Sequence, residues 1–388
     1  MTKTKRVFIL LTTILMSVML ACCGSADTQS KQDSAFDGHR TGSMELLYAD
    51  QFHVDFYDDG IAVIEVEDGL KYLVTEDPEA LPEWLPENIS EDMTIISAPA
   101  SSVYNAASSA MDLIDAIGAI DSVIMTSTQA GDWSIDKIRE LVENDKIRYI
   151  GKYRAPDYEA LLEENVDLAI ESTMIYHSPQ VKEAIEELGI PVLVERSSYE
   201  SEPLGRLEWI KLYGLLLGKS EEADSFFDEA VSKLEGVDTD SISETPTVAF
   251  FSVNSNGSVV VRKPGDYVTK MIEMAGGTYA LKDITEEEEN ALSTMNMQME
   301  AFYDKAVDAD ILIYNSTIEG SLESISDLTA LSDKFADFRA VKEGRVWCTD
   351  ASTFQKTTGV ADMTVEMNRI FAGAEDDNDM EYFHKLAR

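Results

Sequence analysis

The chain is poor in the residues that build disulfide and metal sites. It has three cysteines and four histidines among 388 residues. Cys22 and Cys23 are neighbours and Cys348 stands alone, so no disulfide framework is indicated. A site for bare zinc or manganese needs several histidine and carboxylate ligands that converge. The histidines are scattered along the chain, at His39, His53, His177 and His384, and we therefore predict no metal site.

Sequence motifs of common extracellular hydrolases are also missing. The chain contains no Gly-x-Ser-x-Gly elbow, no His-Glu-x-x-His pair and no phosphate-binding loop. Paired carboxylates are too abundant here to indicate glycosidase chemistry. The sequence therefore predicts a protein that is not an enzyme. A surface-anchored hydrolase or an adhesin remains the alternative from another class.

Positive charge is scarce. The 31 lysines and arginines face 73 aspartates and glutamates, which gives a formal net charge of −42. Such a chain is repelled by nucleic acids and by anionic lipid headgroups, so neither is expected as a partner.

The amino terminus carries an apolar run, Val7 to Leu20, which is too short for a permanent membrane span. Lys3, Lys5 and Arg6 precede it and the small residue Ala21 follows, a pattern typical of a lipoprotein signal peptide over residues 1–21. We expect cleavage before a lipidated Cys22, with Cys23 as the alternative, and mature protein with a net charge near −45 once the three basic residues are removed. Residues 22–44 are small and polar, which predicts a flexible tether with a reach of about 25 Å.

The remaining chain shows two kinds of pattern. Residues 45–75 hold three short alternating runs broken by Asp-Asp-Gly and Glu-Asp-Gly, which predicts a β-meander. From Met93 a strand is expected at MTIISAPA and a helix opening at Ser101 or Ser102, and strands and helices then alternate, which indicates a parallel α/β fold. We predict an N-terminal lobe over 45–202 that includes the meander, a connecting helix over 203–237 that Gly218 bends or divides, and a C-terminal α/β lobe over 238–388.

Seven stretches in order resemble one family. Among them are PDYEALLEENVDLAIES, GRLEWIKLYGLLLGKSEEAD, YVTKMIEMAGGTYAL and FRAVKEGRVWCTD. They are similar to the substrate-binding proteins of ABC importers in the iron-siderophore, haem and cobalamin group, over about Met93 to Phe371. The resemblance implies two Rossmann-like α/β lobes joined by a long rigid helix, with the ligand in the cleft between them. It also implies an extracytoplasmic monomer, anchored to the membrane through its lipid, that delivers its ligand to a permease dimer with its ATPase.

The resemblance further implies where the ligand binds. The family's contacts lie on loops at the carboxyl ends of the strands, as in open α/β sheets generally. Mapped onto this chain, the candidates are Ser101, Ser102, Tyr104, Trp133, Arg154, Tyr176, Tyr199, Arg262, Tyr267, Asn315 and Phe354. Aromatic rings with a few cations suit a bulky anionic ligand. We expect a ferric siderophore as cargo, with cobalamin or haem as alternatives, and no resident cofactor. Tyr176 or His177 could ligate haem, although a histidine near Pro179 is typical of a helix start.

Two glutamates are candidates for docking to the permease. In the family, one exposed glutamate on each lobe pairs with permease arginines, and Glu159 and Glu300 occupy the matching places. Guanidinium groups bind carboxylates bidentately, which suits such a contact. The alternative is that both are solvated glutamates favoured by a helix start.

Overall fold

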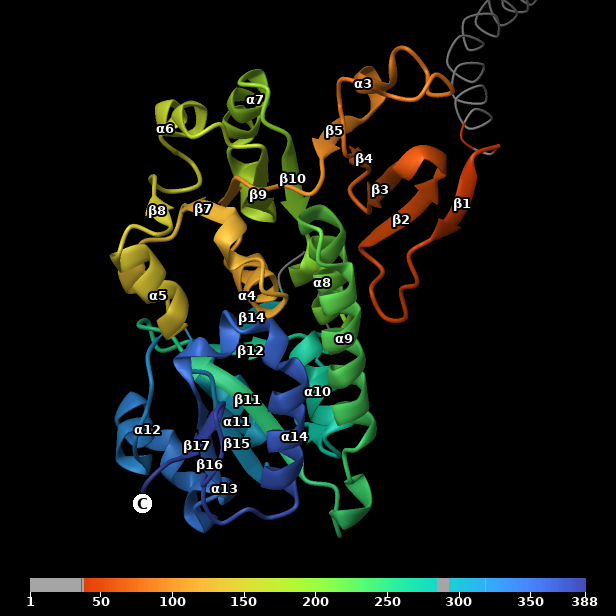
Figure 1. Cartoon of the computed structure of the whole chain (residues 1–388). Coiled ribbons are helices and arrows are strands. Elements are labelled where there is room, and N and C mark those ends of the chain that lie inside the picture. Colours follow the sequence, from red (N-terminus) through yellow and green to blue (C-terminus); the bar gives the residue numbers. More distant parts are fainter. Residues whose placement is uncertain (1–35, 37, 285–292, 318) are drawn as a thin grey trace, which may run out of the picture. The chain divides into compact units, whose positions relative to one another are not determined.

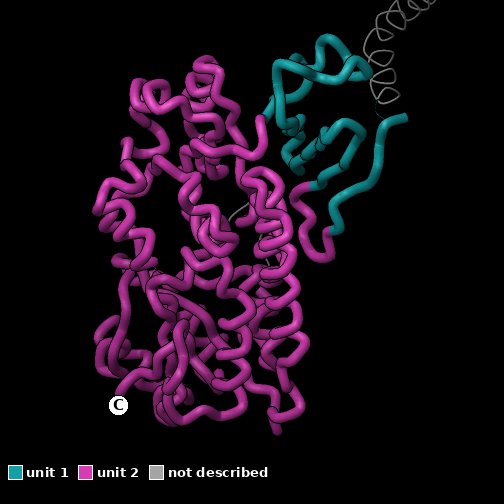
Figure 2. The backbone as a smooth tube through the Cα atoms, viewed as in Figure 1, with its two compact units in different colours: residues 1–45, 53–96 teal, residues 46–52, 97–388 magenta. Residues whose placement is uncertain are grey.

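The computed structural model describes residues 36, 38–284, 293–317 and 319–388. The chain forms two compact units, shown in two colours in Figure 2. Unit 1 comprises residues 1–45 and 53–96, and unit 2 comprises residues 46–52 and 97–388. The signal peptide, Cys22, Cys23 and most of the predicted tether lie outside the described residues. None of the helices in the described residues is long and apolar enough to cross a membrane.

Unit 1 is built on the predicted meander. In its described part, the strands form a sheet in the order β1-β2-β3-β4-β5. They are β1 (Arg40–Ser43), β2 (Phe52–Tyr57), β3 (Ala62–Val66), β4 (Lys71–Thr75) and β5 (Thr94–Ser97). The expected turn at Gly60 has a positive φ of 74°, and the turn at Gly69 has 89°, values that favour glycine. A loop that contains Pro78, Pro82 and Pro86 follows β4 and leads to a short helix, α3 (Ile89–Asp92).

Two boundaries predicted for this region are wrong. The tether was expected to run to residue 44, but β1 pairs with β2 in antiparallel register, with Ser43 opposite Asp55. Arg40 donates to the Asp55 carboxylate at 2.5 Å, so a polar edge strand forms without an apolar pattern. The meander was also placed in the N-terminal lobe, whereas it belongs to a compact unit of its own.

The first lobe of unit 2, residues 97–202, has a parallel sheet. Its strand order is β10-β9-β6-β7-β8, and each neighbouring pair is parallel. The strands are β6 (Val103–Asn105), β7 (Val123–Thr126), β8 (Arg148–Tyr149), β9 (Leu168–Ser172) and β10 (Val192–Glu195). The helices are α4 (Ser108–Ala116), α5 (Asp136–Glu143), α6 (Tyr158–Glu163) and α7 (Pro179–Glu187). Figure 1 shows the alternation of strand and helix that the sequence predicts.

The start of this lobe differs from the prediction. The run at residues 93–100 was expected to be its first strand, but that run forms β5 of the unit 1 sheet. The first strand of the lobe is β6, and its helix α4 begins at Ser108 rather than at Ser101 or Ser102. Pro99 has no backbone N–H to donate and separates the two strands. The three-residue strand that follows is too short to show an apolar period.

The connecting segment consists of two helices, α8 (Pro203–Leu217) and α9 (Ser220–Glu235). Gly218 ends α8 in the left-handed conformation, with a φ of 68°, so the predicted connector is divided there. The helices pack closely, because a Cβ added at Gly214 would lie 2.7 Å from that of Ala223. The α8 helix reaches both lobes. Its Leu216 carbonyl accepts the Ala100 N–H, and its Arg206 lies over the ring of Tyr267.

A segment of residues 46–52, here called the strap, is bound by a carboxylate of α8. Glu208 is fully buried and accepts three backbone N–H groups, from Leu47, Tyr48 and Ala49, at 2.8–3.0 Å. The ammonium group of Lys211 lies 3.1 Å from the same carboxylate. These partners satisfy a charge that burial would otherwise penalise by several kcal/mol.

Glu200 holds the next part of the strap. Its carboxylate accepts the N–H groups of Asp50 and Gln51, each at 3.0 Å, and the indole N–H of Trp209 at 2.9 Å. Burial raises the pKa of Glu200 to about 7. The ring of Phe52 packs edge-on against Trp209, with centroids 4.8 Å apart. The strap is therefore fixed by five consecutive N–H groups, three bonded to Glu208 of α8 and two to Glu200 just before it.

The second lobe of unit 2, residues 238–388, contains a mixed sheet. In the described residues the order is β14-β12-β11-β15-β16-β17, and β13 also pairs with β11. The strands are β11 (Thr247–Val253), β12 (Val259–Arg262), β13 (Thr278–Tyr279), β14 (Thr294–Met297), β15 (Ile311–Tyr314), β16 (Val346–Thr349) and β17 (Phe383–Lys385). The helices are α10 (Tyr267–Met274), α11 (Met299–Ala306), α12 (Ile325–Leu331), α13 (Arg339–Glu343) and α14 (Val360–Phe371).

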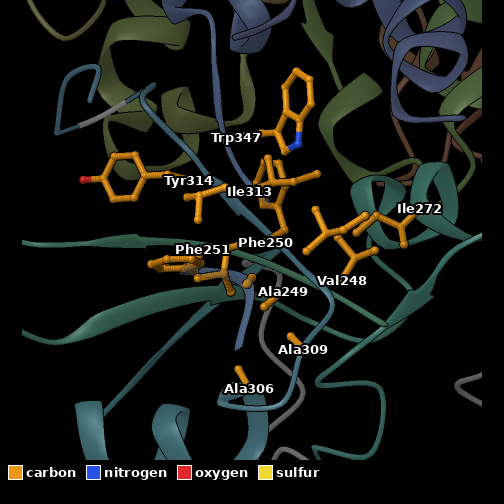
Figure 3. Packing of buried hydrophobic residues seen from close by; sticks show 14 of the residues in the cluster. Val248, Ala249, Phe250, Phe251, Ile272, Ala306, Ala309, Ile313, Tyr314 and Trp347 are labelled. Atoms are coloured by element: carbon orange, nitrogen blue, oxygen red, sulfur yellow. The ribbon is translucent and has the colours of Figure 1, made fainter. Parts of the chain in front are cut away.

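The core of this lobe lies around its central parallel strands. β11, β15 and β16 are parallel neighbours, whereas β12, β14 and β17 run antiparallel to the strands they pair with. In β11, Val248 and Phe250 lie on the same face of the sheet as Ile313 and Trp347 (Figure 3), and Phe251 lies on the other face. The ring of Phe251 stacks on Phe335 at 5.4 Å. This rigid core positions the loops at the carboxyl ends of the strands.

We expect Glu208→Ala to destabilise the protein strongly. The change leaves the Lys211 ammonium and three strap N–H groups buried without their carboxylate, a loss of about 3–5 kcal/mol. Urea unfolding of residues 22–388, with Cys22 and Cys23 changed to serine, measures it. The control is Glu202→Ala. The Glu202 side chain is 41% exposed, and its ion pair with Lys270, at 3.6 Å, is weak. This substitution should therefore lower the free energy of unfolding by less than about 1 kcal/mol. Equal losses in the two variants would contradict the role assigned to Glu208.

Candidate functional site

A pocket opens in the second lobe at the carboxyl ends of β15 and β16. Four of the ligand residues predicted from the sequence line it: Arg262, Tyr267, Asn315 and Phe354. They come from four different elements, namely the end of β12, the start of α10, the residue after β15, and a short 3-10 helix, η8 (Ala351–Phe354). The position agrees with the general rule that open α/β sheets bind ligands at the carboxyl ends of their strands.

The pocket wall is largely apolar. Met271, Met363 and Met367 line it, together with Phe250. Methionine side chains are flexible and polarisable, and they adapt to ligands of different shapes. The open space is about 10 Å³, which is room for one water molecule. A larger ligand therefore needs the wall to move.

Positive charge gathers beside this pocket. The side chains of Arg206 and Arg262 are both buried, at 6% and 7% exposure. Their guanidinium carbons lie 4.0 Å and 5.6 Å from the ring centroid of Tyr267. Asp266 accepts the Val268 N–H as the cap of α10, and its carboxylate is 3.7 Å from Arg262.

Within the described residues, positive charge exceeds negative charge beside the pocket. Burial raises the pKa of Asp266, and the two nearby guanidinium groups oppose that rise. The Arg262 guanidinium also donates to the Ser293 hydroxyl oxygen at 3.2 Å. In the part of the chain that the structure describes, two buried cations thus face the carboxyl group of Asp266, an arrangement that favours an anionic ligand.

Sequence reasoning missed Arg206. The residue lies in the connecting helix α8, where side chains were expected only to pack. Fourteen of the fifteen residues of α8 are buried, so no polar stripe distinguishes one face from another. The available signal was a basic residue in the first turns of a buried helix, in a chain where cations are scarce.

Two predicted residues of the first lobe are deeply buried. Tyr104 is inaccessible within β6, and Trp133 is 2% exposed. The indole N–H of Trp133 donates to the Thr128 carbonyl at 3.2 Å. Neither residue lines the pocket of the second lobe.

The placement expected for Ser101 and Ser102 is wrong. They were expected to follow the first strand of the lobe, but they precede β6 and lie at its amino end. The backbone N–H groups of both donate to the carboxylate of Asp167, which precedes β9. They are therefore at the edge of the sheet opposite the carboxyl ends.

The other predicted residues of the first lobe lie at its surface. Arg154 is exposed, and Tyr176 and Tyr199 are 42% and 37% exposed. The guanidinium carbon of Arg196 lies 4.4 Å from the centre of the Tyr199 ring. His177 is exposed and ends a 3-10 helix just before α7. The structure does not bring these residues into the pocket of the second lobe.

The two lobes touch through residues that adjoin the pocket. The amide group of Gln355 accepts the Ser134 N–H and donates to the Asp132 carbonyl, both at 2.8 Å. The carboxylate of Asp112 on α4 accepts the backbone N–H and the hydroxyl of Thr358, at 2.8 Å and 2.6 Å. Phe354, which lines the pocket, is thus followed directly by residues that bind the first lobe.

The sequence profile of one protein family matches residues 106–353, and its description is "periplasmic binding protein". The chain belongs to this family. The matched span covers the connector and most of both lobes, and the lobes described above agree with the fold that the resemblance implied. This family consists of binding proteins rather than enzymes.

Individual relatives are distant in sequence. The periplasmic binding protein is 24% identical to an uncharacterized lipoprotein of Methanocaldococcus jannaschii, over 78% of this chain and 75% of the relative. A second lipoprotein of that organism is 24% identical over 98% of this chain and all of the relative. The solved catecholate-siderophore binding protein VctP of Vibrio cholerae superposes with a TM-score of 0.57 at 13% identity, covering 79% of this chain and 99% of that protein. VctP and this protein share the fold.

The two docking candidates of this binding protein occupy similar places in the two lobes. Glu159 is the second residue of α6, which precedes β9, and Glu300 is the second residue of α11, which precedes β15. Glu159 is exposed. The side chain of Glu300 is 72% exposed and lies 3.4 Å from Lys334. A hydrogen bond to its own backbone N–H lowers the pKa of Glu300, and Lys334 lowers it further. An exposed ion pair of this kind is weak and exchanges readily.

One buried acid of the first lobe lies apart from all these contacts. Glu171 on β9 is fully buried, and neither carboxyl oxygen has a hydrogen-bond partner among the described residues. Burial raises its pKa from 4.5 to about 8. At neutral pH the carboxyl group therefore holds its proton in the folded protein and loses it in the unfolded chain.

We expect Glu171→Gln to remove a pH dependence of stability. Between pH 4.5 and about 8 the folded protein binds a proton that the unfolded chain releases, so wild-type stability falls as pH rises through this window. The neutral amide has no such penalty. The free energy of unfolding of the variant, relative to that of the wild type, should therefore increase by an amount on the order of 4 kcal/mol between pH 5 and 8. Urea unfolding across this range, with the exposed Glu163→Gln as control, measures the difference. A gap between Glu171→Gln and wild type that stays constant with pH would show that Glu171 is ionised.

Proposed function

We propose that this protein is the extracytoplasmic substrate-binding lipoprotein of an ABC importer and that it captures an anionic iron chelate, a ferric siderophore. The observation that carries the proposal is the pair of buried guanidinium groups, Arg206 and Arg262, beside an aromatic and methionine-lined pocket. Membership of a family of binding proteins supports it.

The chemistry of the pocket matches that of such a chelate. Catecholate and hydroxamate complexes of iron present oxygen atoms and flat organic groups on one surface. Guanidinium groups pair with such oxygens and also stack on rings, and Tyr267 and Phe354 supply rings of their own. Asn315 adds an amide close to the same pocket, with its carbonyl oxygen held by the Thr317 hydroxyl at 2.8 Å.

Haem is the second candidate. The solved haem-binding protein HutB of Vibrio cholerae shares the fold, with a TM-score of 0.56 at 15% identity, and covers 69% of this chain and 98% of that protein. Haem also carries carboxylates that buried arginines could bind, and its flat ring suits a flexible methionine wall. A titration against both classes separates the two candidates.

We expect one ferric chelate to quench tryptophan fluorescence of residues 22–388, with Cys22 and Cys23 changed to serine, in a saturable one-to-one titration. The panel contains ferric catecholate and hydroxamate complexes, haem, cobalamin and free metals. Arg262→Met should weaken binding of that chelate roughly tenfold to a hundredfold, because a hydrogen bond to a charged group contributes about 1.5–3 kcal/mol. The control is Arg339→Met on α13, an exposed arginine that pairs with Asp310 and does not line the pocket, and this variant should bind like wild type. If no member of the panel changes the fluorescence, the proposed ligand class is wrong. If Arg262→Met binds the chelate as tightly as wild type does, Arg262 does not contact the ligand.

We also propose that Glu159 and Glu300 dock the protein on its permease. Each is exposed in the first turn of a helix, where two arginines of a partner could reach it. The two helices precede corresponding central strands, so one carboxylate marks each lobe.

Charge reversal tests this docking role. Glu159→Lys with Glu300→Lys should abolish uptake of the chelate by cells that depend on this protein, while the affinity measured by fluorescence stays within about twofold of wild type. The control reverses Glu163 and Asp304, which are exposed on the same two helices. Persistent uptake by the Glu159 and Glu300 variant would show that both residues are ordinary solvated glutamates.

A further inference from the structure

Asp266 brings a carboxyl group to the two arginines beside the pocket. It directly precedes Tyr267, which lines the pocket, and its side chain is 3% exposed. The carboxylate accepts the Val268 N–H at 3.0 Å and so caps α10, which fixes its position. A carboxylate held next to guanidinium groups has the same charge and the same kind of acceptor oxygens as an anionic group of a ligand. Asp266 thus resembles the group that the pocket is proposed to bind.

The contact between Asp266 and Arg262 is loose. An oxygen of the carboxylate lies 3.7 Å from the Arg262 guanidinium, whereas a hydrogen bond between such charged groups measures about 2.7–2.9 Å. The guanidinium donates to the Ser293 hydroxyl at 3.2 Å. The oxygens of a ligand are free to approach a guanidinium more closely than this capped carboxylate does, and bidentate contacts of that kind are strong. A ligand is therefore the better partner once the charge of Asp266 is removed.

Several elements contribute groups that face Asp266. They are the guanidinium groups of Arg262 at the end of β12 and Arg206 on α8, the phenol of Tyr279 on β13, the hydroxyl of Ser293 before β14 and the N–H of Val268 on α10. Burial raises the pKa of Tyr279, so its phenol carries no charge, and it donates to the Arg262 carbonyl at 2.9 Å. Lys270, further along α10, pairs with Glu202 at 3.6 Å. Burial raises the pKa of Asp266 and the two guanidinium groups lower it, so its charge depends on what else binds the arginines.

We propose that Asp266 selects the charge of the ligand. In the empty protein its carboxylate is the counter-charge of Arg206 and Arg262, and an anionic group of the ligand replaces it in that role as one proton from the solvent binds to the Asp266 carboxylate. An uncharged ligand leaves Asp266 ionised and binds without a proton. The inference rests on the proposed function and deepens it, because it separates anionic catecholate complexes of iron from uncharged hydroxamate complexes.

Proton uptake gives the affinity a defined pH dependence. The pKa of Asp266 is lower in the empty protein than in the loaded one, because the ligand cancels the charge of the arginines. Below both values the carboxyl group is neutral in each state, and above both it is charged in each state. Between them, affinity for an anionic chelate falls as pH rises. Asparagine carries no charge, so Asp266→Asn should bind such a chelate more tightly than the starting protein does at high pH.

The test compares Asp266→Asn with the starting protein, residues 22–388 with Cys22 and Cys23 changed to serine. Asparagine caps helices as well as aspartate does, so the variant keeps the α10 cap and loses only the charge. The matched control is Asp157→Asn, because Asp157 caps α6 of the first lobe and does not line the pocket. Tryptophan fluorescence gives the dissociation constants from about pH 5 to 9. The probes are a ferric complex of a hexadentate tris-catecholate, which is anionic, and an uncharged ferric tris-hydroxamate.

For the catecholate complex, the dissociation constant of the starting protein divided by that of Asp266→Asn should rise with pH, from near one to roughly tenfold to a hundredfold. Protons that the chelate itself gains or loses affect both proteins equally and cancel in this ratio. The Asp157→Asn control should match the starting protein, and the hydroxamate ratio should stay near one at every pH. A catecholate ratio that does not change with pH, or a hydroxamate ratio that rises equally, would overturn the role of Asp266.

Unfolding without ligand tests Asp266 even if the catecholate complex fails to bind, a result that would count against the proposed function alone. The pKa of Asp266 is raised from 3.8 in the folded protein, so the stability of the starting protein relative to Asp266→Asn falls as pH rises above this value and becomes constant above the folded pKa. This plateau should begin below about pH 7, because the guanidinium groups favour the charged form. A relative stability that still falls at about pH 8 would mean that Asp266 is neutral in the empty protein, and the inference would be wrong.

The variant Arg262→Met removes the charge that a ligand would neutralise. Without that guanidinium, the Asp266 carboxyl group should keep its proton to a pH higher by about one to three units. Urea unfolding of Arg262→Met and of Arg262→Met/Asp266→Asn measures the shift of the plateau. An unchanged plateau would show that Arg262 does not hold the carboxylate in its charged form, and proton uptake on ligand binding would then have no cause.

Discussion

The carboxylate of Glu208 makes it possible for α8 to lie inside the protein. A helix that touches both lobes is surrounded by protein, so each of its charged groups has to find a partner there. Glu208 is matched by Lys211 and by three N–H groups of the strap. Arg206, two residues earlier, is matched by the ring of Tyr267. The connector is thus held by directional contacts in addition to apolar packing, and these contacts fix which residues of the second lobe it faces.

The position of α8 also determines the charge beside the pocket. Because α8 brings Arg206 to the ring of Tyr267, a second guanidinium group lies near Arg262, although Arg206 is not part of the second lobe. In the proposed site, the connector therefore supplies a charged group as well as the link between the lobes. From the other side, Thr357 and Thr358, which follow Phe354 closely in the sequence, contact α4 of the first lobe. The pocket lining thus lies next to both the connector and the contacts between the lobes.

The sequence predicted those features that depend on local rules. Gly218 was expected to bend or divide the connector, and it divides it. Arg262, Tyr267, Asn315 and Phe354 were named because the family resemblance places ligand contacts on loops at the carboxyl ends of strands, and these four residues line one pocket. The prediction from sequence failed where contacts between distant segments determine the local structure. The strand β6 has three residues, so it carries no period to recognise, and the misplaced strand moved Ser101 and Ser102 to the wrong sheet edge.

Other residues could not be predicted for a different reason. Arg206 points to a partner sixty residues away, and no pattern within a helix that is buried on every side reveals such a partner. The edge strand β1 is polar, and it is defined by its pairing and its ion pair with β2, which no local pattern in the sequence indicates. The pocket of the second lobe does not include five further candidates, namely Tyr104, Trp133, Arg154, Tyr176 and Tyr199. Their contact with the ligand stays a prediction.

The path of the chain through the strap has a mechanical consequence. The chain leaves unit 1 after Glu45, runs along α8 and returns to unit 1 at His53. A pull on the amino-terminal end loads β1 first and, through the paired strands, β2 and the rest of the unit 1 sheet. Load that travels along the chain beyond β1 next reaches the strap, where five N–H groups bonded to Glu200 and Glu208 share it before it reaches the pocket.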